Sequence, residues 1–405
     1  MTPFIEQPPI GERLPSLVPL VDISVASRFH AFDLARELNS YGMLRFLHTG
    51  YPAFLAERFG LPYKVIHSVY SQEPLNRVSS FLYRRGLVKR RFDFTLSDRF
   101  DRIVARRLRP GADIFVGWSS QCLRSIEKAA TYGMVTIVER GSTHIQWQRA
   151  TLQSEAERTG LPTEIPDSNT VEKELAEYEM ADFIAVPSRF VAGTFAEHGI
   201  KQDRLIINPY GVDLQRFGFQ ERTKNSRGLR VIHVGQVSVR KGVHYLVPAV
   251  EKVRGATLTL VGTIQPGIES VVSRSCTRIV GPVPGTDLPS FYAAADVFCL
   301  LSIEEGLALV ILQAMAMGLP VIATPNTGAE EVITDREEGF IVKAGDSNTV
   351  AERLQWLADH EDQRVEMGRR AQAKVAGGFS WADYGERAHS AYLSILLARN
   401  TYRVQ

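Results

Sequence analysis

The sequence predicts an α/β protein with two domains, and three observations support that fold class. Short apolar runs typical of buried strands alternate with amphipathic helical patterns, as in parallel sheets covered by helices. The 405 residues exceed what one hydrophobic core usually supports, so two cores are expected. Hydrophobic residues make up 44% of the chain, but no apolar run reaches the roughly eighteen residues that span a bilayer.

The first strand and helix are expected at residues 17–25 and 32–38. The loop between them carries Ser27, Arg28 and His30, and open α/β sheets bind ligands where strands end in such loops. Arg28 and His30 are therefore candidates for contacting a substrate. Residues 1–12 are polar and contain several prolines, unlike a secretory signal peptide, so we expect a cytoplasmic protein.

The cysteines Cys122, Cys276 and Cys299 fit a reducing compartment. Their number is odd and each lies in or beside a predicted element, so a disulfide framework is not expected. Their spacing does not match a metal-binding motif either. The sequence thus predicts no metal site.

Positive charge is concentrated in residues 77–109. This segment holds eleven Lys or Arg and three Asp, a net charge of +8, whereas the whole chain carries +2. Aromatic and aliphatic residues are interleaved with the charges, which suits an anionic membrane surface. The same charge would attract nucleic acid, but no recognised nucleic-acid-binding module accompanies it, so we expect no nucleic-acid partner. A solvated basic face or a self-association surface is the alternative.

Residues 136–148 begin as an apolar strand and end in polar residues. Arg140, Ser142 and His144 follow the strand directly, at the edge of the sheet where ligands bind. We expect them to face a cleft. A lone histidine is more often structural or solvated, and that alternative stays open for His144.

Residues 181–217 predict a compact unit of strand, helix and strand, with strands at 183–186 and 205–207. Ser188 caps the helix, and Gly211 is expected to permit a tight turn after the second strand. Charges and glycines interrupt the periodicity at 209–230, where the domain boundary is expected. We therefore predict a first domain of residues 1–208, a second domain of residues 209–379 and closing helices at 380–405.

Residues 231–250 form the next expected unit, a strand, a loop and a helix. The loop contains Gly235 and Gly242 and carries Arg240 and Lys241. Fixed cations at this place can stabilise the charge that develops on a departing phosphate. A basic loop that is merely solvated is the alternative.

Residues 297–328 place a carboxylate beside the start of an apolar helix. A strand is expected at 297–301, a helix from Leu309 that ends before Gly318, and a strand at 321–323. The amides around Gly306, Leu307 and Ala308 precede the helix and suit a phosphate group. Glu305 stands beside them as an acceptor for sugar hydroxyls, and Gln313 lies two turns farther on.

This stretch resembles the retaining glycosyltransferases of family 4, the glycosyl transferases group 1, whose fold is called GT-B. Their signature is a Glu followed by seven residues and a second Glu, and here those positions hold Glu305 and Gln313. Lys241 matches a lysine of the family. Arg240 substitutes for an arginine that relatives often carry after the first glycine of that loop, and His144 resembles the family's cleft histidine.

The resemblance implies two Rossmann-like domains facing across a cleft, with the C-terminal helices crossing back to the first domain. It implies that a sugar is moved from a nucleotide-diphosphate sugar, with retention and without a metal or other cofactor. Glu305 would hold the donor sugar and Gln313 the ribose, while Gly235 and residues 306–309 would complete the donor site. Arg240, Lys241 and His144 would assist catalysis.

The acceptor implied by the resemblance is a saccharide or a lipid-linked saccharide, used in cell-surface polysaccharide or glycolipid synthesis. It would bind the first domain near Arg28, His30, Arg140 and Ser142. Residues 77–109 would hold the enzyme at the inner face of the cytoplasmic membrane. Two alternatives remain: a non-catalytic partner subunit or nucleotide sensor, and another GT-B enzyme such as an epimerase or a phosphorylase.

Overall fold

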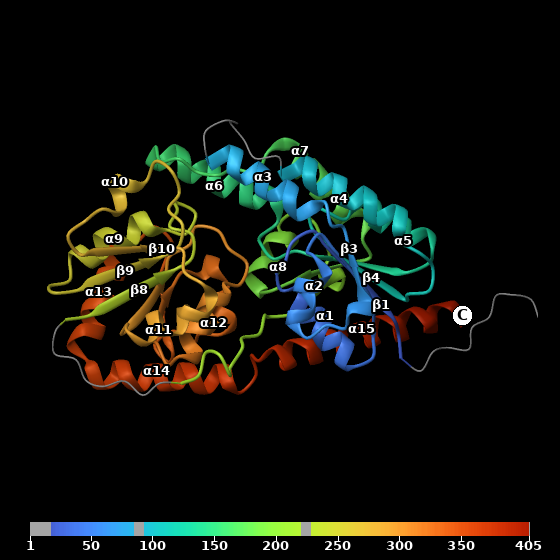
Figure 1. Ribbon diagram of the computed structural model, residues 1–405. Helices are drawn as coiled ribbons and strands as arrows, with labels where there is room; N and C mark the ends of the chain where they lie inside the picture. Colours follow the sequence, from blue (N-terminus) through green and yellow to red (C-terminus); the bar gives the residue numbers. More distant parts are fainter. Residues whose placement is uncertain (1–17, 85–92, 220–227, 405) are drawn as a thin grey trace, which may run out of the picture.

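The computed structural model describes residues 18–84, 93–219 and 228–404, which form two lobes (Figure 1). Each lobe is built on a parallel sheet covered by helices, so the α/β, GT-B-like arrangement predicted from the sequence is confirmed. The first sheet has the strand order β3-β2-β1-β4-β5-β6-β7, and the second has the order β10-β9-β8-β11-β12-β13.

The seven strands of the first sheet all lie within residues 21–207. They are β1 (Val21–Val25), β2 (Leu44–Thr49), β3 (Ile66–Ser68), β4 (Ile114–Trp118), β5 (Val135–Glu139), β6 (Phe183–Val186) and β7 (Leu205–Ile207). Helices cover both faces of a parallel sheet, so its inner strands are apolar and buried. Ile23 pairs with Leu47 on one side and Val116 on the other, and all three side chains are fully buried.

Eight α-helices lie between the strands of this sheet in the described residues. They are α1 (Ala31–Ser40), α2 (Ala53–Ala56), α3 (Gln72–Arg84), α4 (Asp93–Arg107), α5 (Leu123–Thr131), α6 (Ile145–Thr159), α7 (Ser168–Met180) and α8 (Arg189–Ala196). Ser188 caps α8 by accepting a hydrogen bond from the amide of Val191, as its position before the helix predicts.

The second sheet consists of β8 (Arg230–Val234), β9 (Thr257–Val261), β10 (Thr277–Gly281), β11 (Val297–Leu300), β12 (Val321–Ala323) and β13 (Gly339–Ile341). The helices that follow its strands are α9 (Val243–Glu251), α10 (Glu269–Val272), α11 (Leu288–Ala293), α12 (Leu309–Ala316), α13 (Ser347–Asp359) and α14 (Glu361–Ala376). Strand order reverses between β8 and β11, and ligands of open α/β sheets bind beyond the strand ends at such a point.

The last helix, α15 (Trp381–Val404), returns to the first lobe and packs along α1 (Figure 1). Tyr384 and Tyr392 are buried there. Gly385 permits the close approach, because a Cβ at this position would lie 2.3 Å from Cβ of Glu37. The return of the chain therefore ties the first lobe to the end of the second.

The chain crosses between the lobes twice, and the two crossings lie side by side. Val212 forms an isolated parallel bridge with Ser380, and its amide donates to the carbonyl of Phe379 at 2.8 Å. A Cβ on Gly211 would lie 2.5 Å from the carbonyl of Ser380. Gly211 is therefore required by the close contact between the two crossings. The predicted tight turn does not explain it, because the backbone φ of Gly211 is not positive.

Candidate active site

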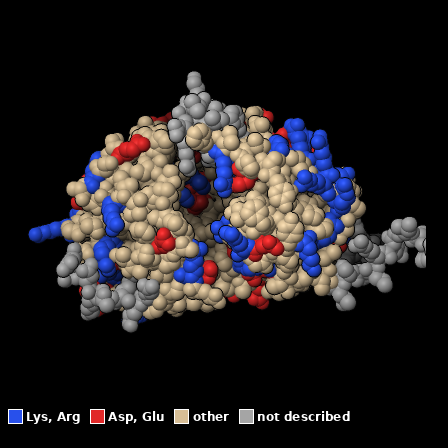
Figure 2. All heavy atoms as spheres, viewed as in Figure 1, with Lys and Arg blue, Asp and Glu red and all other residues tan. Residues whose placement is uncertain are grey.

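A cavity of about 600 Å³ lies between the two lobes and is lined by both. Figure 2 shows the hollow, with charged side chains at its base. The second lobe contributes the loop after β8 and the segment between β11 and α12, while the first contributes the ends of β1, β4 and β5. The carboxyl ends of the central strands of both sheets thus meet at one cavity.

Arg240, Lys241 and Glu305 come together on the second-lobe wall of this cavity, as the sequence predicts for a charged site. The ammonium group of Lys241 contacts the Glu305 carboxylate, and Nη2 of Arg240 lies 3.4 Å from Oε1 of Glu305. Gly242 makes this possible, because a Cβ there would lie 1.9 Å from the carbonyl oxygen of Leu301. The loop after β8 therefore packs closely against the end of β11.

Burial perturbs the ammonium group of Lys241 at this wall. Burial and the neighbouring Arg240 lower the pKa of Lys241, while the Glu304 carboxylate raises it. The contact with Glu305 favours the charged ammonium in the same way. The wall thus holds two basic side chains, Arg240 and Lys241, beside the carboxylates of Glu304 and Glu305.

Helix α12 begins at this wall without a capping side chain. Its first residue, Leu309, lines the cavity together with Leu307 and Ala308. The first-turn amides of a helix have no partner within it, so they offer donors and a partial positive charge to a ligand. The amide of Ala308 differs from the expectation, because it already donates to the carbonyl of Thr327 at 3.3 Å.

Gly235, Gly306 and Gln313 have separate places around the second-lobe wall. Gly235 lines the cavity with a φ of +133°, a conformation that favours glycine. Gly306 is not among the residues that line the cavity, and its carbonyl accepts a hydrogen bond from Ser188 Oγ of the first lobe at 3.1 Å. Gln313 is not among the residues that line the cavity, and its Oε1 accepts from the hydroxyl of Tyr292 at 3.0 Å.

Two residues of the first-lobe wall carry buried polar atoms. Nε2 of His30 and Nε1 of Trp118 are buried without a hydrogen-bond partner in the described part of the chain, and both residues line the cavity. Nε2 of His30 lies 3.5 Å from a carboxylate oxygen of Glu139, and the His30 ring packs on Tyr210 with centroids 4.2 Å apart. Buried polar groups need partners, so these atoms suit a polar ligand.

Arg140 and Ser142 also line the cavity, but their side chains are engaged within the protein. The Arg140 guanidinium donates to Glu174 at 2.9 Å and to Oε1 of Gln148 at 2.8 Å. Ser142 Oγ donates to Oε1 of Glu304 at 2.5 Å. Both residues therefore shape the wall, and Ser142 connects it to the opposite lobe.

His144 and Arg28 do not line the cavity, which corrects their expected positions. His144 is the N-cap of α6 and is buried beside Phe195 and His198, because the chain turns inward after Thr143. Burial, His198 and Arg140 lower the pKa of His144 to about 3, so the ring is neutral at neutral pH. Arg28 lies over the ring of Phe59, 4.1 Å from its centroid.

Glu304, which the sequence analysis did not single out, is the most connected carboxylate at the site. It is fully buried, and its Oε1 accepts from Ser142 Oγ and from the amide and the hydroxyl of Thr143, at 2.5, 3.1 and 2.7 Å. Its Oε2 accepts from Arg240 Nε at 2.8 Å and Gln148 Nε2 at 2.9 Å. Only the adjacent Glu305 falls on the family motif, so sequence spacing carried no signal for Glu304.

Acid is expected to weaken the contribution of Glu304 to stability. Burial alone would raise its pKa, but Arg240, Ser142, Thr143 and Arg140 lower it from 4.5 to about 2. A depressed folded-state pKa stabilises the protein above the unfolded value, and that contribution is lost as pH falls through the folded value. The difference in free energy of unfolding between wild type and Glu304→Gln, from urea titrations, should be constant above pH 4.5 and shrink toward pH 2. A difference that grows with acid would contradict this.

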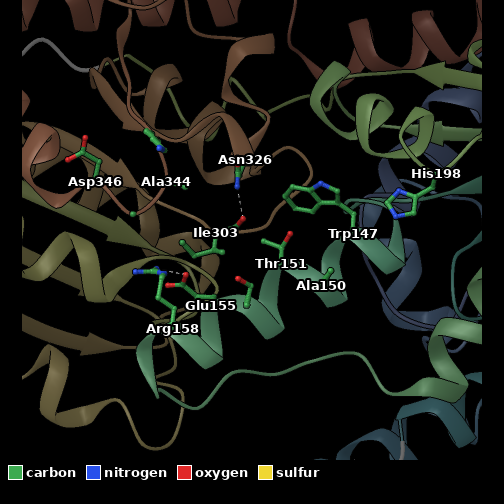
Figure 3. A pocket seen from close by; sticks show the side chains of 13 residues that line it. Trp147, Ala150, Thr151, Glu155, Arg158, His198, Ile303, Asn326, Ala344 and Asp346 are labelled. Carbon is green, nitrogen blue, oxygen red and sulfur yellow. Dashed lines mark hydrogen bonds and ion pairs between the residues drawn. The ribbon is translucent and has the colours of Figure 1, made fainter.

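A second hollow, of about 780 Å³, lies on another side of α6 (Figure 3). Trp147, Thr151 and Glu155 of α6 form one wall, and Asn326 and Asp346 of the second lobe stand opposite.

In the described residues no group of three or more His, Cys, Asp and Glu side chains is placed to hold a metal ion. None of the described helices combines the length and apolar composition needed to cross a bilayer.

Residues 228–360 match the family model described as glycosyl transferases group 1. Among curated proteins, the chain is 30% identical over 222 residues to a D-inositol 3-phosphate glycosyltransferase of Paenarthrobacter aurescens, which covers 48% of this chain and 54% of that protein. It is 28% identical over 214 residues to a sulfoquinovosyl transferase of Arabidopsis thaliana, covering 49% and 42%. The chain thus spans about half the length of the curated relatives it matches.

Solved structures resemble the whole chain in fold. Sucrose-phosphate synthase from Thermosynechococcus elongatus superposes with a TM-score of 0.71 at 17% identity, covering 94% of this chain and all of that one. The Anabaena protein HepE, solved in complex with UDP-glucose, superposes with a TM-score of 0.64 at 15% identity, covering 93% and 99%. At these identities the likeness establishes the fold.

Proposed function

We propose that the chain, which has the GT-B fold and a second domain of the glycosyl transferases group 1 type, is a retaining, metal-independent glycosyltransferase of family 4. It moves a sugar from a nucleotide-diphosphate sugar to a saccharide or lipid-linked acceptor in cell-surface polysaccharide or glycolipid synthesis. One observation carries the proposal: Arg240, Lys241 and Glu305 meet beside the uncapped start of α12 in a cavity between the lobes.

The donor is assigned to the second-lobe wall by its charge. A nucleoside diphosphate is negatively charged. Arg240, Lys241 and the first-turn amides of α12 can bind it together, through ionic contacts and hydrogen bonds to its phosphate oxygens. Glu305 offers carboxylate oxygens to the hydroxyls of the transferred sugar. When the diphosphate binds, it competes with Glu305 for the Lys241 ammonium, which frees that carboxylate for the sugar.

The transfer breaks the bond between the anomeric carbon and the diphosphate oxygen and forms a bond to the acceptor oxygen on the same face. The proton of the acceptor hydroxyl passes to the departing phosphate oxygen, so no protein base is required. Arg240 and Lys241 stabilise the charge that develops on that phosphate, where fixed cations are most effective. They supply the electrostatic stabilisation that a bound metal ion supplies in other enzymes.

The acceptor is assigned to the first-lobe wall. Nε2 of His30 and Nε1 of Trp118, which have no hydrogen-bond partner among the described residues, can bind the hydroxyls of a saccharide, as can the Glu139 carboxylate beside His30. Arg140 and Ser142 hold the shape of that wall. The wall as a whole binds the acceptor. His144 acts indirectly, because as the N-cap of α6 it positions that helix.

The nucleotide is identified by isothermal titration calorimetry with UDP, GDP, ADP and their common sugar conjugates, followed by product analysis with lipid-linked saccharides. We expect one nucleotide sugar to bind and one product with the donor's anomeric configuration to form. Inversion of that configuration would overturn the retaining mechanism. Absence of binding by every conjugate would overturn the donor site and favour a non-catalytic partner subunit.

We also propose that the first domain rests on the inner face of the cytoplasmic membrane. A groove between α4 and α5 is lined by Arg102, Arg106, Arg109, Arg124 and Lys128. Figure 2 shows Lys and Arg side chains gathered over these helices. Leu75, Val78 and Phe81 are exposed at intervals of three residues on α3, and residues 85–92 of the basic segment lie outside the described residues.

Charge reversal in the groove is expected to weaken membrane binding. Arg102→Glu combined with Arg106→Glu should lower the partition coefficient onto vesicles containing anionic phospholipid by tenfold or more, since each surface cation contributes about 1 kcal/mol. The measurement is co-sedimentation with vesicles of phosphatidylcholine, with and without phosphatidylglycerol. Arg369→Glu with Arg370→Glu on α14 is the matched control. Equal loss in both double variants would contradict a groove-specific contact.

A further inference from the structure

We propose that Glu304 is a positioning residue that couples closure of the two lobes to the placement of Arg240 at the diphosphate site. The inference rests on the proposed function, because it concerns the same cavity. Glu304 follows β11 in the second lobe, but three of its five hydrogen bonds come from Ser142 and Thr143 of the first lobe, and a fourth comes from Gln148. The fifth comes from Arg240.

The two oxygens of the carboxylate divide these contacts. Oε1 is held by the loop after β5, whereas Oε2 receives Nε of Arg240 and Nε2 of Gln148. Because Nε is fixed by Glu304, the terminal Nη2 is turned toward Glu305 and Ser142 at the cavity. The orientation of the guanidinium therefore depends on where the first lobe holds Glu304.

Separation of the lobes would remove this support. A fully buried carboxylate that loses its first-lobe donors is left under-satisfied, so it takes up water and releases its fixed geometry. Arg240 then remains paired with a mobile partner and is no longer pre-organised for the diphosphate. Only the closed arrangement presents the cation correctly, and closure also excludes the water that would hydrolyse the donor.

Other contacts between the lobes provide a comparison. Glu155 of α6, shown beside Arg158 in Figure 3, accepts from Tyr245 Oη at 2.7 Å and lies 2.7 Å from Nε2 of His244. Glu155 thus bridges the lobes as Glu304 does, but it lines the second hollow, and the hydrogen bonds of its carboxylate among the described residues are with Arg158, His244 and Tyr245. Replacing it tests the interface without touching Arg240.

The test compares Glu304→Gln, Thr143→Val and Glu155→Gln in the full chain. Thr143→Val removes one first-lobe donor to Glu304 and leaves the cavity lining unchanged, because Thr143 does not line it. Steady-state kinetics with the nucleotide sugar identified by calorimetry give KM and kcat. Small-angle X-ray scattering without ligand gives the radius of gyration.

We expect Glu304→Gln and Thr143→Val to lower kcat/KM for the donor by roughly tenfold or more, since hydrogen bonds to charged groups are the strong ones. Glu304→Gln should also enlarge the radius of gyration. Glu155→Gln should keep kcat near that of wild type. If Glu304→Gln does not fold, Thr143→Val decides the outcome through the same kinetic measurement.

Two results separate the possible failures. Wild-type KM and kcat in both Glu304→Gln and Thr143→Val, with only a lower unfolding temperature, would make Glu304 a structural residue and overturn the inference. Equal losses in Glu155→Gln would overturn it too, since the effect would then follow from any weakened interface. Failure of the wild type to bind any nucleotide sugar would overturn the proposed function instead, and the scattering comparison would still test closure.

Discussion

Replacing Lys241 with alanine is expected to lower kcat/KM for sugar transfer by about a hundred- to a thousandfold, the usual effect of removing one group that stabilises developing charge. The Lys241 ammonium lies at the cavity in contact with Glu305. Its removal takes away a positive charge from the leaving diphosphate and also leaves the Glu305 carboxylate without its main counter-charge. Both changes raise the free energy of the negatively charged diphosphate as it leaves the sugar in this cavity.

Initial rates at several donor concentrations, with the unfolding temperature of each variant, measure this effect. Lys252→Ala is the matched control, because Lys252 belongs to the same domain but is exposed, where its ammonium contacts the side chain of Asn348. We expect the control to behave as wild type. Retention of wild-type kcat/KM in folded Lys241→Ala would remove Lys241 from the catalytic machinery.

Gly306→Ala is expected to prevent the lobes from closing and to lower kcat/KM by about a hundredfold, since small misplacements of catalytic groups have effects of that size. A Cβ at this position would lie 2.1 Å from the carbonyl oxygen of Gly141 and 3.0 Å from Cγ of Pro187. Both atoms belong to the first lobe, and the nearer one is backbone that cannot rotate away. The clash therefore acts between the lobes and leaves each core intact.

The expected signature is lost activity with nearly unchanged cooperative unfolding, measured by kinetics and thermal denaturation. Gly193→Ala is the control, because a Cβ at that exposed position in α8 meets nothing within 4 Å. Replacing a helical glycine in this way should stabilise the protein by about 0.5–1 kcal/mol. Full activity in Gly306→Ala would show that catalysis does not need the contact with Gly141.

Periodicity predicted the elements around the donor wall well. The strand and helix pattern of residues 297–323 appears as β11, α12 and β12, and residues 183–207 contain β6, α8 and β7. These segments are strongly apolar, and each is bounded by glycine, proline or a capping residue, so local sequence determines them. The meeting of Lys241 and Glu305 follows from the order of β8 and β11 in a parallel sheet.

The features that depend on contacts between distant residues could not be predicted in the same way. Glu304 binds Ser142 and Thr143, which are 162 and 161 positions away in the chain, and no local pattern marks such a pair. His144 differs by only two positions from Ser142, yet the start of α6 turns it into the core. The sequence pattern predicted that polar residues follow β5. Which of these residues line the cavity depends on how α6 packs, and a local pattern does not contain that information.

The paired crossings at Val212 and Ser380 fix how one lobe can rotate against the other. Both crossings run along the lower edge of the molecule in Figure 1, whereas α6 and α10 lie along the upper edge. A rotation about an axis through the crossings moves nearby atoms little and distant atoms much. The contact between Gln265 and the carbonyl of Pro162 therefore lies where a given angle produces a large displacement, and a pair of fluorescent labels there would report opening with high sensitivity.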